Sequence, residues 1–400
     1  MKGIVRVMSK KKKWGPYIVL AVIFLCPALI SSFCGGCDNS DGVPAEKKEQ
    51  STPRDTGKRI EAAKAELDKI KEQRAGKDGQ PGKLSITDVT KPEVVLPPVL
   101  ALLGDELGYY GINNEELTKQ IQSDPEKFRA AVPEHGRKRF LILTPAHEKL
   151  IGDKLDSELA AEGKIYHDEA QEARVRRIAE KIIAQLPEPV PLRLFLIKDD
   201  SINAFCLPNG SVYVHSGLLD RIGSDDELAF IIGHEYAHLA ARHSNESTSK
   251  LIFLLAGDVL AEDKANKLEK EGKSGRGLLL RGCYLGGGFV GALLPYRRMM
   301  ENEADTLGIR YMARAGYDPQ GALAFFRRMK SANPKDDPGW VKLLSTHPAD
   351  EKRLKRMQEE YDAIKGGTPR KGLIKRLMKK KEPAQQENDD SPDTSKAEQN

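Results

Sequence analysis

Hydrophobic positions begin to follow a regular pattern near Leu143. Residues 145–161 and 169–186 carry apolar side chains at helical spacing, which predicts two amphipathic helices. Shorter apolar runs then predict three strands, at residues 192–197, 202–207 and 211–215. Pro208-Asn209-Gly210 is typical of a hairpin turn between the last two strands. We therefore expect an α+β fold that is mainly helical, with a small antiparallel sheet.

A further helix is expected to begin at Ser224. Ser224 and Glu227 have the spacing of a capping box, and acidic residues follow in the first turn. The helix carries His234, Glu235 and His238 as a His-Glu-x-x-His motif. Residues four apart share a helical face, so the two histidines can hold one zinc ion, with Glu235 as general base for the attacking water. The alternative is a helix with two hydrogen-bonded histidines and a surface glutamate.

The residues that directly follow the motif do not supply an obvious third ligand. The metzincin pattern requires Gly and His where this chain has Ala241 and Ser244, which excludes that class. His243 belongs to the same turn as His238 or to a fraying one. Glu246 lies eight residues after His238, about 12 Å along a continued helix, which is too far to share the ion. The third ligand is therefore expected from another helix.

The segment RRMMENEADTLGIRYMARAGYDP offers acidic residues at helical spacing. Glu301 and Asp305 are four apart on one face, while Glu303 points away. Glu301 can bind zinc, and Asp305 can accept the free N–H of a zinc-bound histidine. The alternative is a solvated, acidic start of a helix.

Four blocks in this order give the chain a family resemblance: INAFCLPNGSVYVHSGLL, HEYAHLAARH, LPYRRMMENEAD and STHPADEKR. Together they resemble the zinc metallopeptidase family of the CAAX prenyl proteases and the HtpX heat-shock proteases. The single-anchor or lipoprotein periplasmic branch is the most similar. The resemblance covers about Leu143–Tyr361 and implies a gluzincin-type fold, with two metal-bearing helices and an edge strand along the cleft.

The resemblance also assigns roles to individual residues. It implies one zinc ion per chain, held by His234, His238 and Glu301, with Glu235 as the general base. Asp305 matches the acidic residue that closes the family's Glu-x-x-x-Asp motif.

Two further residues gain candidate roles from the resemblance. Arg298 matches a basic residue that pairs with Asp305 or binds a substrate carbonyl. His347, in Ser-Thr-His-Pro, is placed near the active site as a catalytic candidate. There it either stabilises the oxyanion or occupies the open zinc position and holds the enzyme latent; otherwise it simply forms a turn.

The first strand of the expected hairpin is a candidate substrate site. An extended peptide can add to an exposed sheet edge near Asn203–Leu207 through backbone hydrogen bonds. The candidate residues are Asn203, Ala204 and Phe205, and Phe205 either lines the cleft or belongs to the core. Cys206 either pairs with Cys283 in a disulfide or is a small buried residue.

The N-terminus has the pattern of an export signal. Lys2, Arg6 and Lys10–Lys13 precede an apolar run, Tyr17–Ile30, so residues 1–37 predict a signal peptide or a single membrane anchor. Cys37 follows small residues and is a possible lipoprotein site. The alternatives are a buried apolar helix of a cytosolic chain, and the basic targeting region of a mitochondrial inner-membrane member of the family.

Composition divides the rest of the chain. Residues 38–92 predict a low-complexity tether, in which Lys58–Arg74 is either a solvated spacer or a short helix or coiled coil. Residues 93–142 form a short helical region, 143–365 the peptidase domain, and 366–400 a disordered charged tail.

Two apolar or basic stretches carry membrane alternatives. Leu278–Leu294 is expected to be a packed helix of the catalytic domain, with a membrane-inserted hairpin as the alternative. Arg370–Lys381 either touches anionic lipid or is solvated with the rest of the tail.

Overall composition excludes several classes. Hydrophobic residues make up 39% and the mean hydropathy is −0.50, which excludes a polytopic membrane protein. A net charge of +5 with 6% aromatics gives no reason to expect a nucleic-acid partner, and five cysteines exclude a disulfide-rich scaffold.

The sequence therefore predicts a membrane-tethered zinc endopeptidase of the cell envelope. Its catalytic domain is expected in the periplasm or extracytoplasmic space. By resemblance, its substrates are unfolded or misassembled envelope proteins. The alternative is a chaperone-like polypeptide-binding protein with a capped, latent zinc site. The pattern leaves the oligomeric state open.

Overall fold

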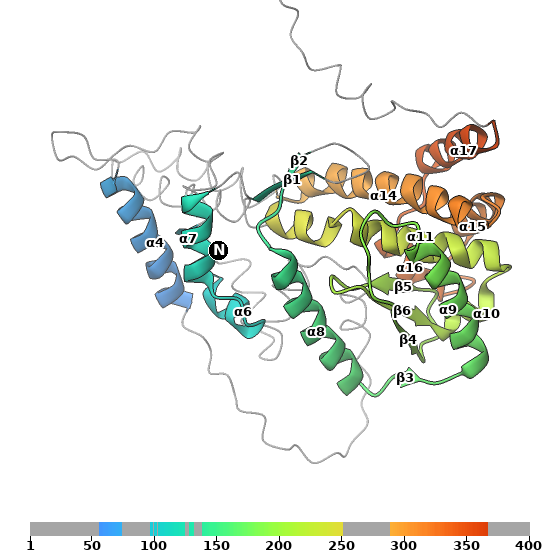
Figure 1. Cartoon of the computed structure of the whole chain (residues 1–400), viewed down its shortest axis with the longest axis horizontal. Helices are drawn as coiled ribbons and strands as arrows, with labels where there is room; N and C mark the ends of the chain where they lie inside the picture. The colour runs from blue at the N-terminus through green and yellow to red at the C-terminus, as the bar shows by residue number, and fades with distance from the viewer. Residues whose placement is uncertain are drawn as a thin grey trace, which may run out of the picture.

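The computed structural model describes residues 56–73, 97–98, 100–101, 103–124, 128–131, 138–250 and 289–366 (Figure 1). The helices are α4 (Thr56–Gln73), α6 (Gly104–Tyr109), α7 (Asn114–Ser123), α8 (Pro145–Ala161), α9 (Glu169–Ile183), α10 (Ser216–Arg221), α11 (Asp225–Ala240), α14 (Phe289–Arg314), α15 (Gln320–Ser331), α16 (Trp340–Thr346) and α17 (Glu351–Lys365). The strands are β1 (Arg129–Ala131), β2 (Lys138–Phe140), β3 (Ile165–Tyr166), β4 (Arg193–Ile197), β5 (Ala204–Cys206) and β6 (Ser211–His215). The fold is mainly helical, as the sequence predicts.

The main sheet has the strand order β3-β4-β6-β5. The expected hairpin is present, because β5 and β6 pair antiparallel across a turn in which Gly210 has a φ of +91°. The expectation of an entirely antiparallel sheet is wrong, because β6 pairs parallel with β4. The hairpin inserts its second strand beside β4, which leaves β5 at the edge of the sheet.

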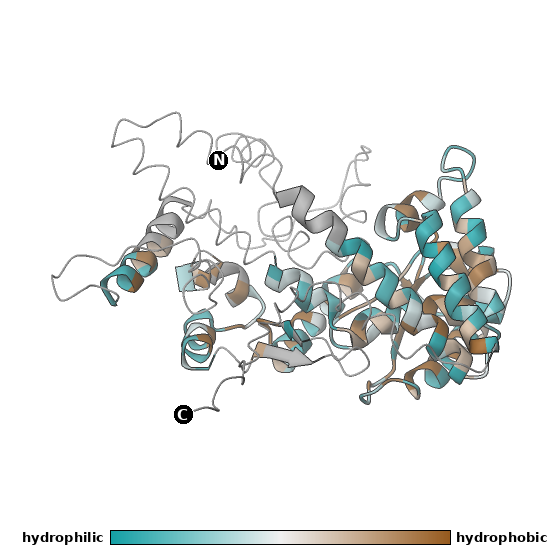
Figure 2. Cartoon of the chain, turned by 90° about the horizontal axis from the view of Figure 1, so that it is seen from above, coloured by the Kyte–Doolittle hydropathy of each residue, from teal (hydrophilic) through white to brown (hydrophobic). Residues whose placement is uncertain are grey.

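Helix α11 lies at the centre of the domain. It packs against α9, α14 and α15 and against the edge strand β5, and Figure 1 shows it between the sheet and α14. Its side chains from Glu227 to Ala237 are all buried, including His234 and Glu235, and His238 is half-buried. Figure 2 shows hydrophobic and hydrophilic residues together on most of the surrounding helices, as one-sided packing requires. The central helix is therefore held from several sides.

The start of α11 departs from its expected capping box in one respect. The Ser224 hydroxyl accepts from the Glu227 backbone N–H at 3.2 Å, as expected. The Glu227 carboxylate instead accepts from the Gly223 N–H at 2.9 Å and pairs with Arg328. The reciprocal half of the box is missing because Arg328 of α15 draws the carboxylate outward.

Within the predicted tether, residues 56–73 form helix α4. On α4, Ala63, Leu67 and Ile70 are 5% exposed or less, so the solvated-spacer interpretation is wrong for that helix. Within the described ranges, no helix is both long and apolar enough to span a bilayer.

Several expectations fall outside the described residues. They are the signal or anchor with Cys37, the pairing partner Cys283, most of Leu278–Leu294, and the basic stretch Arg370–Lys381.

Candidate metal centre

Two glycines bring the backbones of α11 and α14 together. A Cβ on Gly233 would lie 2.9 Å from the Gly308 carbonyl oxygen, and a Cβ on Gly308 would lie 2.9 Å from the His234 nitrogen. Real Cβ atoms do not come so close, so only glycine allows this crossing. The contact aligns the histidine face of α11 with Glu301 and Asp305 on α14.

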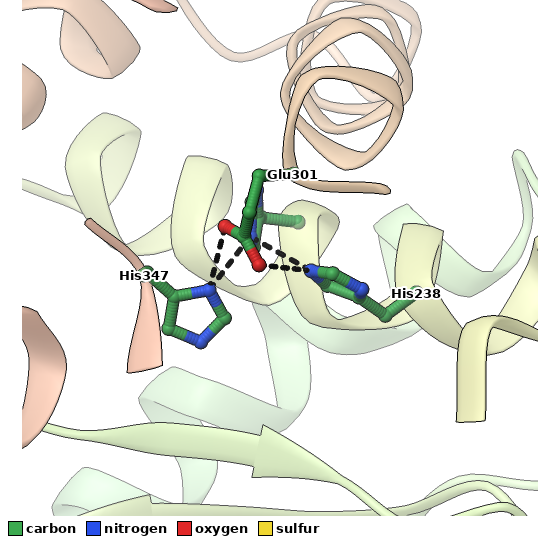
Figure 3. A group of neighbouring side chains, drawn as sticks. His238, Glu301 and His347 are labelled. Carbon is green, nitrogen blue, oxygen red and sulfur yellow. Dashed lines mark hydrogen bonds and ion pairs between the residues drawn. The ribbon is translucent and has the colours of Figure 1, made fainter. Parts of the chain in front are cut away.

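Four side chains converge beside this crossing: His234, His238, Glu301 and His347. Their potential ligand atoms all lie within 4.8 Å of one another. His234 Nε2 is 3.1 Å from His238 Nε2, 3.5 Å from Glu301 Oε2 and 3.3 Å from His347 Nδ1. Glu301 Oε1 is 3.5 Å from His238 Nε2, and its Oε2 is 2.9 Å from His347 Nδ1 (Figure 3).

These separations fit one tetrahedral metal ion. Zinc binds histidine nitrogen and carboxylate oxygen at about 2.0–2.1 Å, which places neighbouring donors of a tetrahedron about 3.3–3.4 Å apart. The five separations given above run from 2.9 to 3.5 Å. Three imidazoles and one carboxylate are also a donor set that zinc prefers. The residues present therefore fit zinc.

The charges around the group favour a cation. Burial by itself would lower the pKa of His234, but Asp305 and Glu301 raise it to about 10. His234 Nδ1 lies 3.1 Å from Asp305 Oδ1, which is the position expected for a carboxylate behind a ligand histidine. Burial lowers the pKa of His238 well below its usual range, which keeps the ring neutral and able to donate a lone pair.

Arg353 of α17, which the sequence analysis missed, balances the carboxylates. Its Nε and one terminal nitrogen each donate to Asp305 at 2.7 Å, and its other terminal nitrogen is 3.2 Å from Glu301. Burial would raise the pKa of Glu301, yet His347 and Arg353 hold it well below its usual range. Arg353 ends the STHPADEKR block, so the signal was present in the sequence.

Arg298 does not pair with Asp305, which was one of its two predicted roles. It is exposed, and both oxygens of Asp305 bind Arg353 instead. Arg298 precedes Asp305 by two helical turns, about 10.5 Å along the axis, so the two cannot meet directly.

Glu235 lies between the metal group and the sheet edge. Its Oε1 is 3.6 Å from His347 Nε2, and the backbone of Cys206 in β5 offers it a hydrogen bond. Burial raises its pKa, partly offset by His347 and His234. A carboxylate with a raised pKa is a stronger base near neutral pH.

The side chains of the predicted substrate strand are buried. Asn203 is fully buried, Ala204 is 1% exposed and Phe205 is 3% exposed. The Phe205 ring stacks on Tyr213 with centroids 5.0 Å apart. Phe205 therefore belongs to the core and does not line a cleft. Only the backbone of this edge strand is placed to meet a peptide. Cys206 is half-buried, and its predicted partner Cys283 lies outside the described residues.

The end of α11 brings another histidine to the site. Arg242 has a φ of +51°, the single non-glycine residue with positive φ in the described part of the chain. This conformation costs about 1–3 kcal/mol, and Arg242 is held in it by Glu148 and by the Leu143 carbonyl, 3.0 Å away. The helix breaks there, so His243 turns back and its Nδ1 lies 2.8 Å from His238 Nδ1.

Glu246 and Glu303 both lie outside the metal donor group, as predicted from the sequence. Glu246 follows the break at Arg242 and does not lie along a continued helix, as was expected; it pairs with Arg139 at 2.8 Å. Glu303 points away from the donor group and contacts Arg139 and His243.

Comparison with known proteins agrees with this geometry. Residues 169–361 match the profile of peptidase family M48. The chain is 32% identical over 234 residues to the mitochondrial metalloendopeptidase OMA1 of Schizosaccharomyces pombe, covering 57% of this chain and 65% of that protein. It is 34% identical over 173 residues to the mitochondrial metalloendopeptidase OMA1 of Arabidopsis thaliana, covering 42% of this chain and 31% of that protein.

A bacterial relative shows the same similarity. The beta-barrel assembly-enhancing protease of Escherichia coli (strain K12) is 26% identical over 238 residues, covering 56% of this chain and 45% of that protein. The chain thus spans less than two thirds of the length of each of these three relatives. The predicted resemblance is confirmed to this extent: residues 169–361 match the profile of peptidase family M48.

Proposed function

We propose that the chain is a zinc-dependent metalloendopeptidase that cleaves unfolded or misassembled proteins. The observation that carries the proposal is the position of Glu235, which lies beside a tetrahedral donor group and against the edge strand β5. His234, His238 and Glu301 would hold the ion. The metalloendopeptidase names of the relatives support the same activity.

The chain's own residues supply substrate alignment and proton transfer. A peptide added to the edge strand β5 would be held by backbone hydrogen bonds, so its sequence would matter little. When bound, zinc supplies a Lewis acid that polarises the scissile carbonyl and lowers the pKa of water. Glu235 takes a proton from the attacking water and delivers it to the leaving amine. Asp305 and Arg353 keep His234 and Glu301 oriented throughout.

The test is cleavage of casein by the zinc-loaded full chain and by its Glu235→Gln variant. Loss of the base should slow cleavage by about 10²–10⁴-fold. Glu188→Gln is the matched control, because Glu188 is an exposed glutamate outside the site. Zinc content is measured for each variant. Equal cleavage by wild type and Glu235→Gln would refute the proposal.

A second candidate, a polypeptide-holding protein with a latent zinc site, rests on His347. Its Nδ1 lies 2.9 Å from Glu301 Oε2 and 3.3 Å from His234 Nε2, so it would take the fourth position that a catalytic zinc site keeps open. His347→Ala separates the two functions. An increase in casein cleavage with zinc retained indicates a capped enzyme, whereas suppression of casein aggregation without cleavage by either form indicates a holding protein.

We also propose that the N-terminal basic and apolar segment tethers the protein to a membrane of the cell envelope. Envelope proteins would then be the substrates, and a relative named beta-barrel assembly-enhancing protease supports that class. The mitochondrial relatives support an inner mitochondrial membrane as the alternative. Membrane fractionation with protease protection of the native protein tests the tether. Recovery in the cytosolic fraction would contradict both locations.

A further inference from the structure

A buried chain of polar groups lies behind His238, on the side opposite the donor group. His238 Nδ1 is 2.8 Å from His243 Nδ1, and His243 Nε2 is 3.2 Å from Glu303 Oε2. The other oxygen of Glu303 contacts the Arg139 guanidinium. Arg139, His243 and Glu303 are all well buried in their side chains. The chain therefore runs from a metal ligand to an arginine of β2.

Hydrogen-bond chemistry gives this chain a direction. A carboxylate held by a guanidinium only accepts, so the His243 Nε2–H donates to Glu303. The Nδ1 of His243 is then the acceptor for the Nδ1–H of His238. His238 is left with the lone pair of Nε2, the atom 3.1 Å from His234 Nε2 and 3.5 Å from Glu301 Oε1.

We infer that His243, Glu303 and Arg139 are positioning residues that fix the ring orientation and donor atom of His238, so that the segment before the peptidase domain is part of the metal site. The inference rests on the proposed function in taking His238 as a metal ligand. Groups behind metal-bound histidines do this in metalloproteins, and they add to metal affinity without touching the metal.

The location of Arg139 gives the inference its wider consequence. Residues 139–148 lie before residue 169, where the family match begins. This segment holds the end of α11 through several contacts. Arg139 donates to the Ala241 carbonyl at 2.7 Å, the Ile142 N–H to Ser249 at 2.8 Å, and Arg242 pairs with Glu148. The matched domain alone, residues 169–361, would contain His243 and Glu303 but would lack Arg139.

The experiment measures zinc affinity of the full chain by competition with a chromophoric chelator. His243→Phe removes both hydrogen bonds and should weaken zinc binding by about 10–100-fold. His243→Gln can accept from His238 and donate to Glu303, so it should restore most of the affinity. Arg139→Met should weaken zinc binding in the same direction. Arg177→Met is the matched control, since that arginine pairs with Asp225 on the surface.

Melting temperatures of the zinc-free variants separate positioning from general stability. The inference requires that His243→Phe and His243→Gln melt similarly without zinc yet differ in zinc affinity. Arg139→Met added to Glu303→Leu should cause little further loss of affinity, because both act through one chain. Wild-type zinc affinity in His243→Phe, or equal losses in the Phe and Gln variants, would overturn it. Wild-type affinity in Arg139→Met would remove the N-terminal segment from the site.

This outcome is independent of proteolysis. Zinc affinities that follow the expected order in a chain that does not cleave casein would leave the inference standing and refute the proposed enzyme. If the chain cleaves casein but its zinc affinity is the same with and without His243, the proposed enzyme stands and the inference is refuted.

Discussion

Replacing Arg353 with methionine should destabilise the fold severely. The guanidinium is buried, makes two hydrogen bonds to Asp305 at 2.7 Å, and lies 3.2 Å from Glu301. It also donates to the Pro348 carbonyl at 2.7 Å, next to His347. Removing one partner of a buried ion pair leaves an uncompensated charge and costs about 3–5 kcal/mol. The loss should be smaller with zinc bound, because the ion compensates the charge of Glu301.

Chemical unfolding followed by circular dichroism provides the measurement. The free energy of unfolding is compared for wild type and Arg353→Met, each with a chelator and with zinc. Arg353→Lys keeps the charge but loses the bidentate geometry, so it should lie between the two. Arg177→Met serves as control, because that arginine is half exposed and its ion pair is worth at most about 1 kcal/mol. A chelator-treated Arg353→Met within about 1 kcal/mol of wild type would refute the buried-charge argument.

Four further outcomes follow from the site. Gly308→Ala should cost about 1–3 kcal/mol in a thermal melt and weaken zinc binding, whereas Gly108→Ala, with open space around it, should not. Asp305→Asn should weaken zinc affinity about 10–100-fold by chelator competition; wild-type affinity would contradict its role behind His234. Phe205→Ala should cost about 3–5 kcal/mol in unfolding free energy, and a change confined to KM for casein would return Phe205 to the cleft. Zinc at about 100 times its Kd should add about 2.7 kcal/mol to stability, an increase that Glu301→Gln should largely abolish.

Local spacing indicated three of the four donor residues, His234, His238 and Glu301, whereas His347 came only from the family resemblance. His234 and His238 are one turn apart, as are Glu301 and Asp305, so each pair shares a helical face whatever the tertiary structure. The tertiary structure then had only to align the histidine pair of α11 with the acidic pair of α14 where the two helices cross. That crossing depends on Gly308, which nothing in the local pattern marked.

Longer-range features could not be predicted from the same spacing. The family resemblance suggested Arg298 as a partner of Asp305, but Arg353 reaches Asp305 from another helix. The left-handed conformation of Arg242 could not be predicted, since arginine has no preference for positive φ. The parallel pairing of β4 with β6 depends on where the hairpin inserts, and alternation within strands says nothing about it.

The backbone contact of Gly233 with Gly308 separates the part of the site that is fixed by the helix crossing from the part whose structure can vary. At Gly233 and Gly308 the backbones of α11 and α14 approach without an intervening side chain. The helix backbones that carry His234 and Glu301 should therefore keep their spacing at this crossing in variants that retain both glycines. Changes in rate or substrate range should arise instead in the loop of His347 and at the edge of β5, which the crossing does not constrain.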